Sequence, residues 1–154
     1  MKIIKNIWQI LVGKPFEESL EARIFHAVCI LSVFTLAFSV VFNYFIGLEK
    51  LAAIMLVVFL MVLIFYYYSR FRAKTTITIL FYGILSHIVF AINYYFNSGI
   101  SGPTLLIFIA SLFLIVSIAP PKQFWFWITF NIVIVLTLLY IQFNHSSEVP
   151  YTYP

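Results

Sequence analysis

Residues 75–121 decide the fold. They read TTITILFYGILSHIVFAINYYFNSGISGPTLLIFIASLFLIVSIAPP, without one Asp, Glu, Lys or Arg. The run is too long for a single membrane crossing, because a bilayer core takes about 20 helical residues. Its one long interruption is Asn93–Pro103, NYYFNSGISGP, where two glycines and a proline break the helix. The run therefore predicts two transmembrane helices, about Thr75–Phe96 and Thr104–Ala119, joined by a polar and aromatic loop.

The composition argues against a soluble domain. Hydrophobic residues make up 64% of the 154-residue chain and charged residues 9%, whereas soluble proteins carry about 25% charged residues. Most apolar side chains must therefore face lipid or other helices. In such a chain the net charge of +4 reports membrane orientation and does not indicate nucleic-acid binding. The lone Cys29 argues against a thiol oxidoreductase, which needs a cysteine pair.

Three more stretches are long and apolar enough to cross a bilayer. They are about Ile24–Leu48, Leu51–Ser69 and Gln123–Phe143. Together with the two helices of residues 75–121, they predict an all-α integral membrane protein with five transmembrane helices. Trp125 and Trp127 begin the last span, and both suit an aromatic belt at the membrane interface.

Residues 1–12, MKIIKNIWQILV, have an amphipathic pattern. At about 100° per residue, the Ile, Leu, Val and Trp side chains fall on one half of a helix and the Lys, Asn and Gln side chains on the other. The pattern predicts either a helix lying in the membrane interface or a coupling helix packed on the membrane domain. Pro15 then fits the first turn of a short acidic helix, with Glu17 and Glu18 at its N-terminal end, that continues into the first span.

The basic residues predict the orientation. One side of the membrane would carry Lys2, Lys5, Lys14, Arg23, Arg70, Arg72, Lys74 and Lys122. The other side would carry only Lys50, so the positive-inside rule predicts a cytoplasmic N-terminus and an outer Asn93–Pro103 loop. The chain then divides into a cytoplasmic interfacial segment (1–23), a five-span domain (24–143) and an extracytoplasmic tail (144–154). We expect the native protein to continue into a sixth span.

The third span has a polar side and an apolar side. His87 lies near its middle, and an ionisable residue at that depth is a functional-site hypothesis. The alternative is a neutral histidine that is hydrogen-bonded to a neighbouring helix. The candidate ligand-binding residues come from this polar side, the following loop and the first span: His87, Asn93, Tyr94, Asn97, Tyr82, Ser86 and Asn43.

Two other polar features favour helix packing. On the first span, small and polar residues follow one another at i, i+3, i+7 and i+11: Ser32, Thr35, Ser39 and Asn43. Such a stripe lets helices approach closely, here against the third span, or lines a polar cavity between the two. Asn131 stands alone near the middle of the last span and predicts an interhelical hydrogen bond.

The sequence predicts no catalytic, metal or cofactor site. No span carries an Asp or Glu, which argues against an ion-coupled transporter or proton pump. A phosphate loop, a nucleophile elbow and a zinc motif are absent from the sequence. The three histidines, His26, His87 and His145, lie too far apart along the predicted topology to share a metal ion.

The predicted spans, the N-terminal helix and the connections NYYFNSGISGPT (93–104) and PPKQFWFW (120–127) resemble a known family. The whole chain is similar to the N-terminal multi-span membrane sensor region of bacterial sensor histidine kinases, particularly of the Bacteroidetes type. The resemblance rests on topology and one loop rather than on a catalytic motif. It implies about six helices before a cytoplasmic dimerisation-phosphotransfer domain and an ATP-binding domain. Neither the phospho-acceptor His motif nor the ATP-lid glycines occur in this chain, so kinase activity would belong to another part.

We therefore expect a sensory input domain of a two-component sensor histidine kinase in the bacterial inner membrane. Its expected partners are the lipid bilayer, a second copy through a homodimeric parent protein, and an unidentified small-molecule or membrane signal, but no nucleic acid. One alternative is a small transporter or a substrate-binding membrane subunit, with its site lined by the polar sides of the first and third spans. Another is a structural or assembly subunit of a membrane complex.

Overall fold

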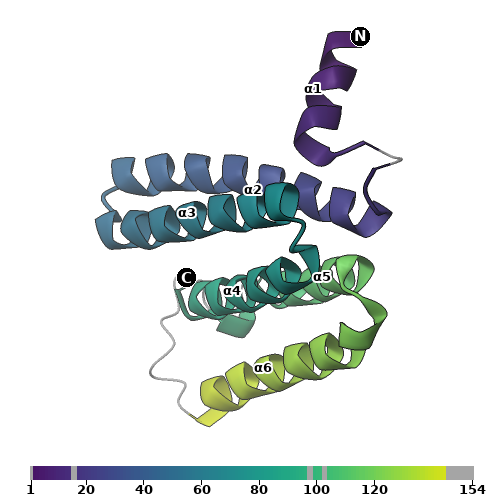
Figure 1. Cartoon of the computed structure of the whole chain (residues 1–154). Coiled ribbons are helices and arrows are strands. Elements are labelled where there is room, and N and C mark those ends of the chain that lie inside the picture. Colours follow the sequence, from purple (N-terminus) through teal and green to yellow (C-terminus); the bar gives the residue numbers. More distant parts are fainter. Residues whose placement is uncertain (1, 15–16, 97–98, 102–103, 145–154) are drawn as a thin grey trace. The chain divides into compact units, whose positions relative to one another are not determined.

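The computed structural model describes residues 2–14, 17–96, 99–101 and 104–144, and these form helices joined by short turns with no strand among them (Figure 1). In chain order the elements are α1 (Lys2–Val12), α2 (Leu20–Phe45), α3 (Glu49–Arg72), α4 (Thr75–Phe96), η1 (Gly99–Ser101), α5 (Thr104–Ile118), η2 (Pro121–Gln123) and α6 (Phe124–Asn144). The all-α prediction is confirmed. The Asn97 position, part of the predicted site, lies outside the described residues.

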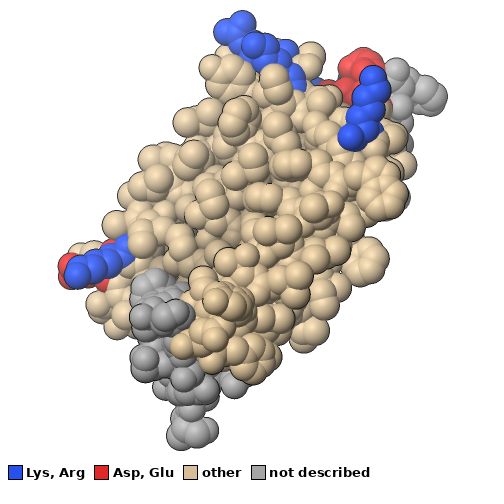
Figure 2. Space-filling model, turned by 90° about the horizontal axis from the view of Figure 1, so that it is seen from below, with Lys and Arg blue, Asp and Glu red and all other residues tan. Residues whose placement is uncertain are grey.

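Four of the helices are long and apolar enough to cross a membrane, judged by length and composition: α2, α3, most of α4, and α6. Helix α5 is apolar but has 15 residues, fewer than the roughly 20 that span a bilayer core. Large hydrophobic side chains such as Phe34 and Phe113 are exposed over these helices. Figure 2 shows a wide area of the surface without Lys, Arg, Asp or Glu side chains. A surface of this kind suits contact with lipid.

The chain forms two compact units, residues 1–82 and 83–154, and the division falls inside α4. We call them the N-terminal unit and the C-terminal unit and describe each by itself. The N-terminal unit holds α1, α2, α3 and the first turns of α4. The C-terminal unit holds the rest of α4 with α5 and α6.

In the N-terminal unit, α2 and α3 lie side by side as a hairpin, and α1 runs across their direction (Figure 1). The buried side chains of α3 are small: Ala52, Val58, Val62 and Ser69. Small side chains let two helices approach closely, which is how apolar helices associate where water does not drive them together.

Helix α2 begins later than its sequence predicts. Ser19 is its N-cap, with extended backbone and a side-chain oxygen that accepts a hydrogen bond from the Ala22 amide at 3.2 Å. Glu17 and Glu18 precede the helix, so their predicted place in its first turn is wrong. The helix begins after this serine, because the serine oxygen satisfies an amide that has no partner within the helix.

In the C-terminal unit, the core contains large aromatic and branched side chains from all three helices, among them Tyr94, Phe108, Ile115 and Trp127. Trp127 is 0% exposed, whereas Trp125 is 80% exposed. The prediction that both tryptophans form an interfacial belt is therefore wrong for Trp127. That side chain packs against α4, where Gly83 leaves room for its ring.

Candidate functional site

His87 lies in the core of the C-terminal unit with both ring nitrogens hydrogen-bonded. Its Nδ1 is 2.8 Å from the Gly83 carbonyl oxygen one turn earlier in α4, and its Nε2 is 3.1 Å from Nδ2 of Asn131 in α6. The same Asn131 Nδ2 donates to the Phe108 carbonyl of α5 at 3.1 Å. The predicted interhelical role of Asn131 is confirmed, since its amide joins α6 to both other helices.

These partners specify the neutral form of His87. A carbonyl oxygen only accepts, so the hydrogen of the ring lies on Nδ1. The Asn131 amide must present its NH₂ group toward Phe108, because an amide oxygen there would face a second acceptor. That NH₂ group donates to Nε2 of His87, which leaves no place for a second ring hydrogen. The geometry therefore favours the hydrogen-bonded, neutral alternative for His87.

Aromatic rings enclose His87. Trp127 stacks on it at 5.9 Å between ring centroids with an interplanar angle of 21°, and the Phe130 and Phe108 rings lie at 5.2 and 5.9 Å. The His87 side chain is 1% exposed. A ring that is packed and bonded in this way specifies how α4, α5 and α6 fit together.

We expect Gly83→Ala to destabilise the C-terminal unit. A methyl group at Gly83 would overlap Cη2 of Trp127 and lie 2.8 Å from its Cζ2. Overpacking of this kind costs about 1–3 kcal/mol, more than the gain of about 1 kcal/mol in helix propensity. Denaturant titration of the protein in mixed micelles measures the difference. An alanine variant as stable as the wild type, or more so, would contradict the close Gly83–Trp127 packing.

A second polar group joins the same three elements nearer the predicted loop. Asn93 Nδ2 donates to Thr104 Oγ1 at 3.1 Å, and the Tyr94 hydroxyl donates to Gln142 Oε1. The same Gln142 oxygen accepts from the Ile100 amide of η1 at 2.9 Å. Of the predicted site residues, His87, Asn93 and Tyr94 thus lie in one unit, each bonded to a neighbouring element or helix. The sequence does not predict this role of Gln142, because a polar residue near the end of a span is common.

Of the remaining described site residues, Ser86 belongs to the C-terminal unit, and Tyr82 and Asn43 belong to the N-terminal unit. Tyr82 is in the N-terminal unit, where its hydroxyl is 2.9 Å from Ser32 Oγ of α2. Asn43 bonds to its own helix at Ser39 O, 2.7 Å away. Ser86 is half-buried on α4. Of the predicted polar stripe, Ser32 is thus hydrogen-bonded to α4, whereas Asn43 bonds within α2.

A polar cluster that is not predicted from the sequence lies at the C-terminal end of α1. The last carbonyls of a helix have no partner within it. Here the Ile10 oxygen accepts from Arg70 Nε and Nη2 at 3.3 and 3.1 Å. The Leu11 oxygen accepts from the Tyr66 hydroxyl at 2.7 Å, and the Val12 oxygen accepts from His26 Nδ1 at 2.9 Å. Side chains of α2 and α3 thus cap α1, and we call these side chains with Glu18 and Ser69 the α1 clamp.

His26 is the centre of the α1 clamp and is 1% exposed. Its Nδ1 also lies 3.1 Å from Glu18 Oε2, and its Nε2 lies 2.9 Å from Ser69 Oγ. Ser69 Oγ in turn lies 3.2 Å from Thr75 Oγ1 at the start of α4. One imidazole ring therefore connects α1, the segment before α2, and α3.

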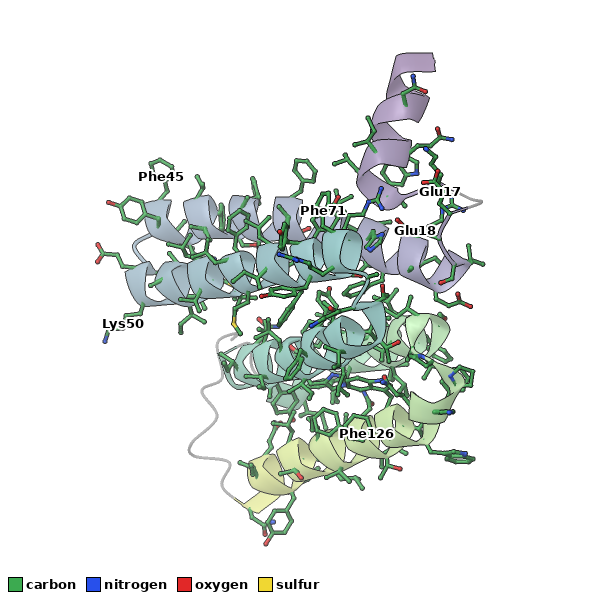
Figure 3. All side chains as sticks on the ribbon, viewed as in Figure 1. Glu17, Glu18, Phe45, Lys50, Phe71 and Phe126 are labelled. Carbon is green, nitrogen blue, oxygen red and sulfur yellow. The ribbon has the colours of Figure 1, made fainter. Side chains whose placement is uncertain are left out.

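Glu18 completes the α1 clamp through an ion pair with Arg70, and both side chains are 19% exposed. Figure 3 shows Glu18 where the chain passes from α1 to α2, at the opposite end of the hairpin from Phe45 and Lys50. Gly13, with a φ of 106°, makes the turn after α1, and a Cβ there would lie 2.6 Å from the Glu18 carboxyl carbon. The carboxylate reaches His26 because that position is glycine.

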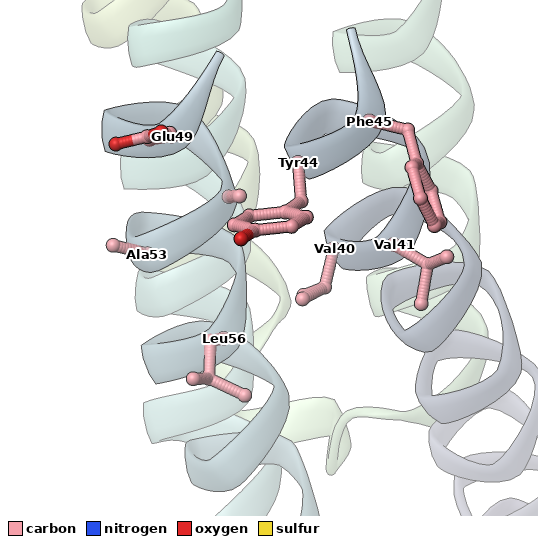
Figure 4. Close-up of a pocket in the computed structure, with 8 residues that line it drawn as sticks. Val40, Val41, Tyr44, Phe45, Glu49, Ala53 and Leu56 are labelled. Carbon is pink, nitrogen blue, oxygen red and sulfur yellow. The ribbon is translucent and has the colours of Figure 1, made fainter. Parts of the chain in front are cut away.

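A cleft of about 440 Å³ lies between α2 and α3 near their turn (Figure 4). Its walls are apolar except for the polar atoms of Tyr44 and Glu49. It contains none of the predicted site residues. Within the described residues, no group of His, Cys, Asp or Glu is arranged to hold a metal ion.

Comparison of the chain with protein-family models, curated proteins and solved structures finds no match.

Proposed function

We propose that this chain is the membrane-embedded input domain of a signal-transducing protein, of the sensor histidine kinase type, in the bacterial inner membrane. The observation that carries the proposal is the α1 clamp. Its side chains tie a helix too short to cross the bilayer to two helices that are long enough to do so. A change in the packing of α2 against α3 would move His26, Tyr66 and Arg70, and α1 with them.

The exposure of α1 supports a position in the membrane interface. Trp8, Ile10 and Leu11 are exposed, whereas Val12 is buried against the clamp. Exposed Trp, Ile and Leu on a short helix suit the boundary between headgroups and acyl chains. Arg70 bonds to α1 and lies in the last turn of α3, and basic residues at the end of a span mark the cytoplasmic headgroup layer.

The proposed topology has five spans, with α5 as the short one, and a cytoplasmic N-terminus. The basic residues around the α1 clamp support this side for α1: Lys14, Arg23, Arg70, Arg72 and Lys74. The stimulus would act on the spans from the membrane or the outer side. The output domain would lie in a further part of the parent protein, as the resemblance to sensor kinases implies, and the parent would be a homodimer.

Tyr66→Phe tests whether the clamp transmits a signal. The variant keeps the ring and removes only the hydrogen bond to Leu11 O, which is worth about 1 kcal/mol or a factor of about five. We expect the autophosphorylation rate of the native protein in inside-out membrane vesicles to change by about fivefold.

Tyr67→Phe is the matched control, because Tyr67 is the next residue and is exposed. Equal behaviour of the two variants would argue against α1 as the transmitting element. Measuring the mass of the native polypeptide comes first. A polypeptide without an effector domain, in vesicles without phosphorylation, would reject the sensor proposal and turn attention to transport assays.

A further inference from the structure

His26 and His87 are both buried, and they differ in whether the ring can take up a proton without a change of its partners. Both donate from Nδ1 to a carbonyl oxygen, Val12 for His26 and Gly83 for His87. At Nε2 they meet different groups. His87 faces the NH₂ group of Asn131, which only donates in this arrangement, whereas His26 faces the hydroxyl of Ser69, which can donate or accept.

The Ser69 hydroxyl can form a hydrogen bond with His26 whether the ring is neutral or protonated. When the ring is neutral, the Ser69 hydroxyl donates to Nε2. When the ring is protonated, Nε2 donates to Ser69, and Ser69 donates to Thr75 across their 3.2 Å contact. The two states differ in the direction of the single Ser69 hydroxyl hydrogen, which points to His26 Nε2 in the first and to Thr75 Oγ1 in the second.

A carboxylate is in place to balance the added charge. Glu18 Oε1 pairs with Arg70, while Glu18 Oε2 is buried without a hydrogen-bond partner and lies 3.1 Å from His26 Nδ1. An imidazolium at this position places a full positive charge beside the oxygen that Arg70 leaves free. The charged form of a buried group is stabilised by such a partner. Because Glu18 is 19% exposed, it also gives protons a route from water to the ring.

We infer that His26, Glu18 and Ser69 form a proton-binding site that fastens α1 to the α2–α3 hairpin. The inference deepens the proposed function by naming a ligand, and it stands on the geometry of the α1 clamp. The titratable or charged side chains facing the ring are Glu18 from the segment before α2, and Tyr66 and Arg70 from α3. The docked α1 adds one neutral acceptor, the Val12 carbonyl oxygen.

Proton uptake and α1 docking are therefore linked. The docked state supplies the imidazolium with Glu18, Val12 O and Ser69 Oγ together, so it binds the proton more tightly than a state in which α1 and Glu18 have moved away. Acidification therefore tightens the clamp, and a rise in pH loosens it.

The test uses the full-length native protein in lipid nanodiscs, with ¹⁵N-histidine spectra recorded from about pH 5 to pH 8. We expect His26, identified by the signal lost in His26→Gln, to change from the Nδ1-protonated neutral form to the cation as the pH falls. His87, identified through His87→Gln, should keep the neutral Nδ1-protonated form throughout. In Glu18→Gln, the cation of His26 should be less abundant at a given pH than in the parent protein, because the neighbouring negative charge is removed.

A spin label on α1 measures the linkage. Asn6→Cys provides an exposed attachment point, and the native Cys29 is fully buried, so it stays unlabelled. Label mobility should rise as the pH rises in the parent protein, and this pH dependence should be lost in His26→Gln. If His26→Gln does not fold, Ser69→Ala provides the second variant, and it should shift the midpoint of the mobility change.

A His26 signal that does not change over this range would overturn the inference, as would a mobility change that persists unaltered in His26→Gln. Both measurements are made on the protein itself and need no signalling readout. A titrating His26 in a protein without kinase output would reject the sensor function alone. A His26 that does not titrate would reject the proton site and leave the sensor function standing.

Discussion

Replacing Trp127 with alanine is expected to lower the free energy of unfolding by about 3–5 kcal/mol. Trp127 is fully buried, stacks on His87 and fills the space above Gly83. Its removal would leave a cavity beside the ring that connects α4 to α6 through Asn131. Helices that pack against one another inside a membrane depend on such van der Waals contact more than on exclusion of water.

Trp125→Ala is the control for Trp127→Ala, because it removes the same side chain two residues earlier in α6. Trp125 is 80% exposed, and substitutions at exposed positions usually change stability by less than about 0.5 kcal/mol. Denaturant titration in mixed micelles compares the two variants. Similar losses for both would mean that Trp127 is not the core residue described above.

Arg70→Met is expected to detach α1 from the hairpin. The variant keeps an apolar side chain of similar length but removes the ion pair to Glu18 and the two hydrogen bonds to the Ile10 carbonyl. It also leaves the Glu18 carboxylate largely buried without its cation. Breaking a fully buried pair costs about 3–5 kcal/mol, and because both partners are 19% exposed, we expect a smaller loss, about 2 kcal/mol.

Local opening of this size is measured by hydrogen exchange. Amides in the last turn of α1 and the first turn of α2 should exchange about 30-fold faster in Arg70→Met, the factor that corresponds to about 2 kcal/mol. Amides in α5 and α6 should not change. Arg72→Met serves as the control, since Arg72 is exposed in the same turn of α3. Faster exchange in both variants alike would indicate a general effect of charge removal.

The helices could be predicted from the sequence, because long uncharged runs ended by charges, Gly or Pro fix where a chain can cross a membrane. The start of α2 differs from the prediction, although the sequence contains a signal for it. Ser19 is a good N-cap residue, but Pro15 is a competing start signal, and local preference alone does not rank the two. The difference amounts to one turn of helix.

The environment of individual side chains could not be predicted in the same way. Trp125 and Trp127 are two residues apart, so they point to different sides of α6, and an apolar helix gives no sign of which side faces its neighbours. In a soluble helix, the alternation of apolar and polar residues marks the face that packs against the core. A membrane helix lacks this pattern, because the lipid around it is as apolar as the core. Asn131 was interpreted correctly because a lone polar residue in a span needs a partner whichever way it faces.

The α1 clamp cannot be predicted from the sequence for a different reason. Its side chains are at positions 18, 26, 66, 69 and 70. No local sequence pattern connects these positions with each other or with the carbonyls of residues 10–12. A usable sign was the C-terminal end of the amphipathic helix, whose free carbonyls require donors. Tyr66 and Arg70, four residues apart on one face of α3, are such donors.

The clamp holds α1 by its main chain, since Arg70, Tyr66 and His26 all bond to carbonyl oxygens. Every amino acid has that oxygen, so docking places little demand on the identity of residues 10 and 11. Their side chains are free to diverge in response to the lipid that surrounds them. The side chains of residues 10 and 11 can therefore change to suit a different membrane while α1 stays attached. The attachment instead requires the three donors on the hairpin, His26, Tyr66 and Arg70.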